Sequence, residues 1–265
     1  MSKSVVFVSF LAACATGLAT QLVDQGTDLV GSFRMYGGTD AADGAYPFMV
    51  SLRTSQNRHF CGGSIITERW VVTAGNCVFG RDASNIIAVA GTNTLSSGGV
   101  FNEACRIVIH SNFNDTGHLS NDIAMVLLKL PFKYSRIITP AIISYDLAEH
   151  IVNVTMIGWG KTVRTSDYSD RLQEFSSQTI RRALCETYYL GLLTRTNMCT
   201  KFQKGTAFSY GDAGGPLFQT DNKEQIGIAS FHYKRASGIK PDVYTKLAPY
   251  TRWIQDTIRL MKHRC

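Results

Sequence analysis

The strongest constraint on the fold is a series of short apolar runs that recurs along most of the chain. From Pro47 to about Thr245 these runs have the length of β-strands, and Gly, Asn, Asp or Ser separates each from the next. Such a pattern is typical of an all-β barrel or sandwich. The clearest predicted strands are residues 48–52, 70–74, 86–90, 123–128, 152–157 and 225–230.

The last segment of the chain has a different pattern. It contains neither Gly nor Pro after Tyr250, and its apolar residues recur at the spacing of one helix face: Trp253, Ile254, Ile258 and Met261. We therefore expect an amphipathic C-terminal helix. Its final turn is basic, as the helix dipole favours.

The first residues have the pattern of a targeting segment. Lys3 precedes an apolar stretch over residues 5–13, and small residues follow as far as Ala19. We interpret residues 1–19 as a signal peptide, which is too short to span a bilayer. The mature protein is expected to be secreted and extracellular, without a membrane-embedded segment.

Cysteine content and charge fit this compartment. Of the seven cysteines, Cys14 lies in the signal peptide, and the remaining six predict three disulfides whose pairing the spacing leaves open.

The formal net charge is +7, but the basic residues are scattered along the chain. We therefore interpret them as a solvated surface and expect no nucleic-acid partner.

Four segments carry a resemblance to a known family. They comprise Cys-Gly-Gly-Ser at 61–64 with Val-Val-Thr-Ala-Gly-Asn-Cys at 71–77, the run 121–128, Gly-Trp-Gly at 158–160, and Gly-Asp-Ala-Gly-Gly-Pro at 211–216 with 240–245 behind it. In this order they resemble the chymotrypsin/trypsin family over residues 35–265. The resemblance implies two six-stranded antiparallel β-barrels with a cleft between them and a C-terminal α-helix.

The residues that carry the family's chemistry are changed. That chemistry uses a serine nucleophile, a histidine base and an aspartate that orients the histidine. The resemblance places these roles at Ala213, Asn76 and Asp122. An amide does not accept a proton near neutral pH, and alanine has no nucleophilic atom. We therefore expect no functional peptidase, and only a vestige of the oxyanion hole at Gly211 and Ala213.

The sequence disfavours two alternatives to natural loss of activity. Rescue by another residue is not expected, because His59 and His232 fall at other family positions and Ser209 is too far from position 213. An engineered serine-to-alanine trap would not explain Asn76. Nor would it explain the absence of the family's pocket disulfide, whose two halves correspond to Ser209 and the region of Arg235.

The resemblance also implies a rebuilt specificity pocket. Ala207 stands where trypsin has its acid, and bulky Phe208 and His232 are expected to narrow the cleft. Asp242 is interpreted as pairing with His232 or with a nearby lysine. The pocket set is completed by Tyr210 on the rim together with Ser230 and Phe231.

Proteolytic activation remains compatible with the sequence. Residues 20–34 are interpreted as a propeptide, with cleavage expected after Arg34. By resemblance, the freed ammonium of Met35 would then pair with Asp212.

The remaining expectations concern covalent and metal chemistry. By resemblance, Cys61 pairs with Cys77 and Cys185 with Cys199, which leaves Cys105 for Cys265.

Asn114 is a candidate glycosylation site, whereas the sequon at Asn153 lies in an apolar run and is expected to be less accessible. Glu103 aligns roughly with the trypsin calcium loop, but that loop has no further acids here. No metal or cofactor is therefore expected.

The leading hypothesis is a secreted, inactive protease homologue that acts as a monomer by binding a host or endogenous protein, with no membrane partner. Among such families it most resembles the inactivated serine protease paralogues of scabies mites, which are related to the group 3 mite allergens. That resemblance implies interference with host defence, including complement. The alternatives are a residual serine endopeptidase and a non-catalytic cofactor of a protease cascade.

Overall fold

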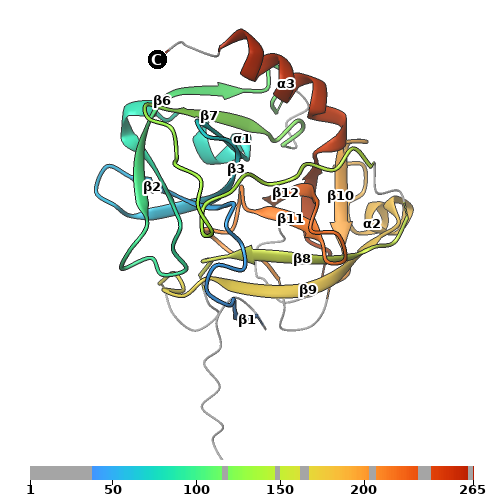
Figure 1. Cartoon of the computed structure of the whole chain (residues 1–265). Helices are drawn as coiled ribbons and strands as arrows, with labels where there is room; N and C mark the ends of the chain where they lie inside the picture. Colours follow the sequence, from blue (N-terminus) through green and yellow to red (C-terminus); the bar gives the residue numbers. More distant parts are fainter. Residues whose placement is uncertain are drawn as a thin grey trace, which may run out of the picture. The chain divides into compact units, whose positions relative to one another are not determined.

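A computed structural model of the 265-residue chain describes residues 38–114, 119–146, 150–161, 167–202, 207–231, 240–261 and residue 265 (Figure 1). The predicted signal peptide, the propeptide and the cleavage site between Arg34 and Met35 lie outside these residues. His232, Arg235 and the remainder of the sequon that begins at Asn114 also lie outside them.

The first half of the described chain forms a closed antiparallel barrel. Its strands pair in the order β2-β3-β4-β7-β6-β5, and β5 returns to β2. Inward-facing aliphatic side chains fill the barrel because alternate residues of each strand face its interior. The strands are β2 Met49–Thr54, β3 His59–Thr67, β4 Trp70–Thr73, β5 Ile86–Ala90, β6 Val100–Ile109 and β7 Ala124–Leu128.

The second half forms another six-stranded antiparallel ring, in the order β8-β9-β10-β13-β12-β11 with β11 paired back to β8. The short strand β1, Thr39–Asp40, adds to β9. The ring consists of β8 Asn153–Gly158, β9 Gln173–Ile180, β10 Asn197–Thr200, β11 Pro216–Gln219, β12 Gln225–Phe231 and β13 Val243–Lys246. The expected fold of two six-stranded barrels is confirmed.

Helical segments are short except at the C-terminus. The helix α3, Thr251–Leu260, follows a 3-10 turn η2, Ala248–Tyr250, and buries Ile254 against the core of the first barrel (Figure 1). This confirms the expected amphipathic helix. The other helical segments are α1 Gly75–Val78, η1 Ala83–Asn85 and α2 Arg182–Tyr189.

All six strands singled out from the sequence are present, with bounds that differ by two residues or fewer. The helix α2 had no corresponding prediction. It buries only Cys185 and Tyr189, which lie one turn apart and pack with Val243 of β13. Two buried positions produce too weak a periodic pattern to distinguish this helix from a loop.

Three disulfides stabilise the fold: the two that the family resemblance implied, and the pair that was left by elimination. Cys61–Cys77 joins β3 to α1, and Cys185–Cys199 joins α2 to β10. Cys105–Cys265 connects β6 of the first barrel to the last residue of the chain, across a sequence separation of 160.

The sequon at Asn153 corrects an expectation. Asn153 is exposed at the first position of β8, where its side-chain oxygen accepts a hydrogen bond from Gln178 at 3.0 Å. The threonine of this sequon, Thr155, is buried, and its hydroxyl lies 3.1 Å from the hydroxyl of Thr220. Asn114 is exposed as well.

Candidate functional site

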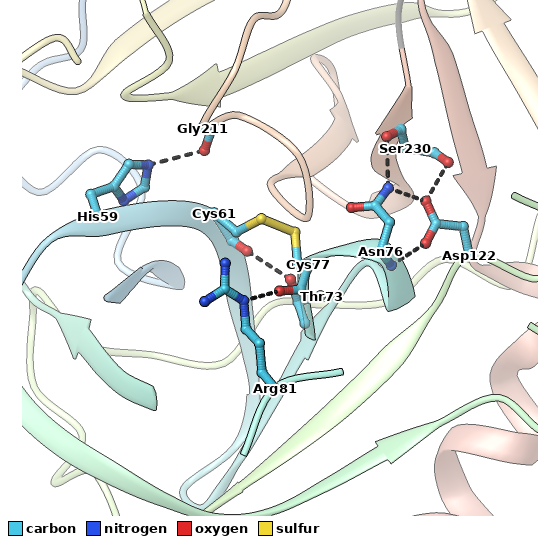
Figure 2. Close-up of a disulfide and its surroundings, with 10 residues drawn as sticks. His59, Cys61, Thr73, Asn76, Cys77, Arg81, Asp122, Gly211 and Ser230 are labelled. Atoms are coloured by element: carbon cyan, nitrogen blue, oxygen red, sulfur yellow. Dashed lines mark hydrogen bonds between the residues drawn. A yellow bond between two sulfur atoms is a disulfide. The ribbon is translucent and has the colours of Figure 1, made fainter. Parts of the chain in front are cut away.

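The site lies where residues from both barrels meet. Asn76 belongs to α1, which directly follows β4, and Asp122 lies just before β7. Ser230 comes from β12 of the second barrel, and Ala213 from the loop that leads into β11. The structure thus brings together the three positions that the resemblance assigned to the triad: Asn76 is hydrogen-bonded to Asp122 (Figure 2), and Ala213 lines the same cavity as Asn76.

The loop before β11 packs directly on the first barrel. The Gly62 N–H of β3 donates to the Ala213 carbonyl at 2.8 Å. Gly214 has a φ of 80°, and a β-carbon there would lie 2.1 Å from the Thr73 hydroxyl and 2.5 Å from the Gly62 carbonyl. Only glycine satisfies both the positive φ and this close approach, so the position of Ala213 is set by backbone contacts.

Asn76 is held by Asp122 through two hydrogen bonds. Its backbone N–H donates to one carboxylate oxygen at 2.7 Å, and its Nδ2 donates to the other at 2.6 Å. The same Nδ2 donates to the Ser230 carbonyl at 3.0 Å, and the Ser230 hydroxyl also donates to Asp122. Figure 2 shows the Asn76 amide oxygen turned away from Asp122. Asn76 therefore acts as a donor to the carboxylate and has no basic atom to offer the cleft.

The residue that precedes Ala213 is buried and bonded to backbone groups. The Asp212 carboxylate accepts hydrogen bonds from Gly160 N–H at 2.7 Å and from Ser209 N–H at 2.8 Å. A β-carbon at Gly160 would lie 1.9 Å from a carboxylate oxygen, so this approach requires glycine. The expected pairing of Asp212 with Met35 falls outside the described residues.

A cavity of about 330 Å³ opens beside these groups. Several residues predicted for the pocket and the oxyanion vestige line it with Asn76 and Ala213: Phe208, Tyr210, Gly211, Ser230 and Phe231. Tyr210 is exposed at the rim, whereas Phe208 is buried and packs edge-on against Tyr244. Ala207 and Asp242 are not among the lining residues.

Asp242 is held by a backbone hydrogen bond. Its carboxylate accepts a hydrogen bond from the Phe208 backbone N–H at 3.0 Å and is buried beneath the pocket. In the part of the chain that the structure describes, it forms no ion pair with a lysine, and His232 lies outside that part. A buried carboxylate needs a donor, and the Phe208 N–H supplies one.

Burial controls the ionisation of the carboxyl groups at the site. It raises the pKa of Asp122 to about 6, of Asp212 to about 7 and of Asp242 to about 8, while the hydrogen bonds to each carboxylate oppose the rise. Burial acts in the opposite direction on His59, lowering its pKa from 6.5 to about 4. The two effects have opposite consequences for stability.

These pKa values predict how stability depends on pH. From about pH 4 to 6.5 the folded state binds fewer protons at His59 than the unfolded state but more at the three aspartates, so His59 offsets only part of the fall in stability that the aspartates cause. From about pH 6.5 to 8.5 only Asp212 and Asp242 remain, and the folded state binds more protons. The free energy of unfolding is therefore expected to fall as the pH rises through this second range, as urea titrations monitored by tryptophan fluorescence would measure.

Asp242→Asn is the matched variant, because an amide oxygen still accepts from the Phe208 N–H. At about pH 8.5 this variant is expected to be more stable than the natural chain by roughly 1–3 kcal/mol. At about pH 5 the two proteins should have similar free energies of unfolding, because Asp242 is then protonated in the folded natural chain. Stability that rises steadily with pH, or a variant with the same pH slope as the natural chain, would contradict this account.

Two residues that line the cleft, Arg81 and Phe60, were not predicted from the sequence. Arg81 lies five positions after Asn76, and its guanidinium carbon stacks 4.0 Å from the centre of the Phe60 ring. Its Nε donates to the Cys77 carbonyl at 2.8 Å (Figure 2). The sequence contains no signal for this placement except proximity to Asn76, since stacking on Phe60 depends on the barrel bringing β3 beside α1.

His59 has a structural environment, as its family position suggested. Its Nδ1 lies 2.9 Å from the Ser51 hydroxyl, and its Nε2 lies 3.0 Å from the Gly211 carbonyl. Within the described ranges, no group of three or more His, Cys, Asp or Glu side chains is placed to hold a metal ion. Glu103 instead pairs with Lys129 at 2.6 Å. No described helix is long and apolar enough to cross a membrane.

Two six-stranded barrels with this cleft define a trypsin-like protein, and comparison with known proteins agrees. The family model named Trypsin matches residues 35–254. Anionic trypsin of Bos taurus is 32% identical over 85% of this chain and 90% of that protein. Chymotrypsin-2 of Vespa crabro is 32% identical over 83% of this chain and 97% of that protein. The chain belongs to the trypsin family.

A longer match extends this relationship. Cationic trypsin-3 of Rattus norvegicus is 29% identical over 97% of this chain and 98% of that protein. This similarity covers almost the full length of both sequences.

Proposed function

We propose that this trypsin-family protein has no proteolytic activity and acts by binding another protein. The observation that carries the proposal is the pair of side chains at the centre of the cleft. Asn76 donates both Nδ2 hydrogens, one to Asp122 and one to Ser230, and Ala213 presents a methyl group. Acyl transfer needs a nucleophile and a base within hydrogen-bond reach, and this pair supplies neither.

Secretion is part of the proposal. Three disulfides are typical of proteins that fold in an oxidising compartment. The leader-like residues 1–19 support the same conclusion. By its resemblance to the inactivated mite paralogues, the proposed role is interference with host defence, with a complement protein as the candidate partner.

The first test is a chemical one. Purified protein, both uncut and cleaved after Arg34, is treated with a fluorescent serine-directed fluorophosphonate beside active bovine trypsin. The expected result is no covalent labelling and no turnover of peptide substrates, because the cleft holds no activated hydroxyl. Labelling at one mole per mole of protein would establish the residual endopeptidase instead.

A second measurement addresses the role in host defence. Addition of the purified protein to serum is expected to reduce complement-dependent lysis of sensitised erythrocytes in a dose-dependent manner. Heat-denatured protein serves as the control. Unchanged lysis at concentrations well above that of the complement proteins would remove complement as the target, while the fluorophosphonate result would still decide whether the protein is inactive.

A further inference from the structure

The cleft contains a cation that is fixed in place but only partly bonded. Stacking on Phe60 and the hydrogen bond from Nε to the Cys77 carbonyl hold the guanidinium of Arg81. Its two terminal nitrogens donate to no residue in the described part of the chain. Arg81 also lines the same cavity as Asn76. A held guanidinium loses little side-chain entropy when it binds a carboxylate.

A second cavity, of about 450 Å³, lies beyond Gly211. The His59 ring lines this second cavity and bonds to the carbonyl of Gly211, which lines the first. Tyr168 forms another part of the wall and packs so closely on Gly211 that a β-carbon there would lie 2.6 Å from the tyrosine ring. The Lys161 ammonium lies 5.4 Å from the centre of that ring.

Arg53 also lines the second cavity. Its side chain is 1% exposed and donates to the Ser51 hydroxyl, the Asn57 side chain and the Leu95 carbonyl. The remaining terminal nitrogen, Nη2, is buried without a hydrogen-bond partner in the described structure. A buried guanidinium with an unfilled donor contributes positive potential to the cavity above it.

The acidic residues of the second cavity only partly balance these charges. Both carboxylate oxygens of Asp170 already accept hydrogen bonds from Ser96, one from its N–H and one from its hydroxyl. Arg58 and Lys161 line the cavity beside Asp167 and Asp170. With Arg81, the two adjoining cavities thus contain four cations and two carboxylates, apart from the fully bonded Asp122 behind Asn76.

We propose that these two cavities form one basic groove, from Arg81 past Tyr168 to Lys161 and Arg58, and that it binds an acidic stretch of a partner protein. The inference rests on the proposed function, because a stable complex in this cleft requires that the bound segment is not cleaved. Carboxylates of the partner would pair with Arg81 at one end and with Lys161 or Arg58 at the other.

The chemistry favours a protein segment over a sulfated polysaccharide. The cations are few, and Asp167 and Asp170 lie among them, so a uniform polyanion would meet repulsion along the groove. A peptide with acidic residues at intervals avoids that repulsion. In the described structure, the backbone N–H groups of Gly211 and Ala213 donate to no protein acceptor, so they are also available to the carbonyls of an extended chain.

The test uses the full protein and a defined probe. A fluorescein-labelled peptide of about eight residues with alternating Glu and Ala is titrated by fluorescence anisotropy at low salt, beside the same peptide with Gln in place of Glu. The Glu peptide is expected to bind at least about tenfold more tightly. Arg81→Gln and Lys161→Gln are each expected to raise its Kd by about five- to tenfold, the loss of one charge-assisted pair.

Arg252→Gln on α3 is the matched control. It removes the same charge from a side chain that is 94% exposed and does not line either cavity, and it should change the Kd by less than about twofold. Thermal melting checks that each variant folds. If Arg81→Gln lowers the Tm, the test rests on the Kd of Lys161→Gln alone. Equal binding of the two peptides, or equal weakening by Arg252→Gln, would overturn the proposal.

Two further outcomes separate this inference from the proposed function. Tighter binding of a heparin fragment than of the Glu peptide, with the same dependence on Arg81, would identify a polysaccharide site and overturn the proposal for a protein partner. Labelling of the same preparation by the fluorophosphonate would refute inactivity alone. If the protein is not labelled and does not bind the Glu peptide, the proposal of an acidic-peptide groove is refuted while the proposal of inactivity stands.

Discussion

Replacing both Asn76 by His and Ala213 by Ser is expected to create fluorophosphonate labelling at least about a thousand-fold above that of the natural chain. Position 76 already lies within hydrogen-bond distance of Asp122, so a histidine there would have its orienting carboxylate in place. The Gly62 hydrogen bond and the close packing of Gly214 hold position 213 against the first barrel. The phosphonate tests the nucleophile without requiring an intact specificity pocket.

The two single replacements are the controls for this experiment. Each restores one member of a pair that works only together, and in a related protease the loss of either member costs about a million-fold in turnover. Neither single variant should therefore rise clearly above background. A folded double variant that stays unlabelled, before and after cleavage at Arg34, would show that positions 76 and 213 are not aligned for catalysis.

Removal of the Cys105–Cys265 disulfide is expected to lower the free energy of unfolding by about 5 kcal/mol, the loop-closure value for a cross-link of this span. The double variant Cys105→Ser with Cys265→Ser removes it without leaving a free thiol. The effect is large because the cross-link closes 160 residues of chain. Guanidinium denaturation monitored by circular dichroism measures the change.

The second disulfide provides the comparison. Cys185–Cys199 spans only 14 residues, so its removal should cost about 3 kcal/mol, roughly 2 kcal/mol less than removal of the longer cross-link. The difference between the two variants tests loop closure directly. Equal losses would instead indicate that local packing around each cross-link, and not the length of the loop, determines its contribution.

The fold was largely predictable because its signals are local. Six strands of the two barrels appear in the sequence as apolar runs, and α3 appears as a helical spacing that ends in Met261. The helix α2 was not predicted, since it exposes most of its surface and has only two buried side chains. Short elements held by distant neighbours leave little periodic signal in the sequence.

The site was predictable only as far as the family resemblance reached. Positions 76, 122 and 213 do meet, but the sequence did not indicate that Asn76 would donate to the carboxylate with both its backbone and side-chain nitrogens. The hydrogen bond that Asp242 accepts from the Phe208 N–H was not expected either, and its predicted partner His232 lies outside the described residues. Such contacts depend on loop geometry that residue identity does not determine.

The groove around Arg81 illustrates the same limit. Arg81, Tyr168 and Arg53 lie far apart in the sequence, and their neighbouring residues show no common motif. They come together because β2, β3 and the segment after β8 converge beside Gly211. The scattered basic residues predict a solvated surface, and the proposed groove would involve four of them: Arg53, Arg58, Arg81 and Lys161.

The hydrogen bonds around Asp122 have an evolutionary consequence. Three donors from two distant parts of the chain converge on this single carboxylate: two nitrogens of Asn76 and the Ser230 hydroxyl. A descendant that lost the acid would bury all three donors unpaired, at a cost of about 1–3 kcal/mol for each. Selection for a foldable protein is thus enough to preserve the aspartate, whether or not the cleft hydrolyses peptides.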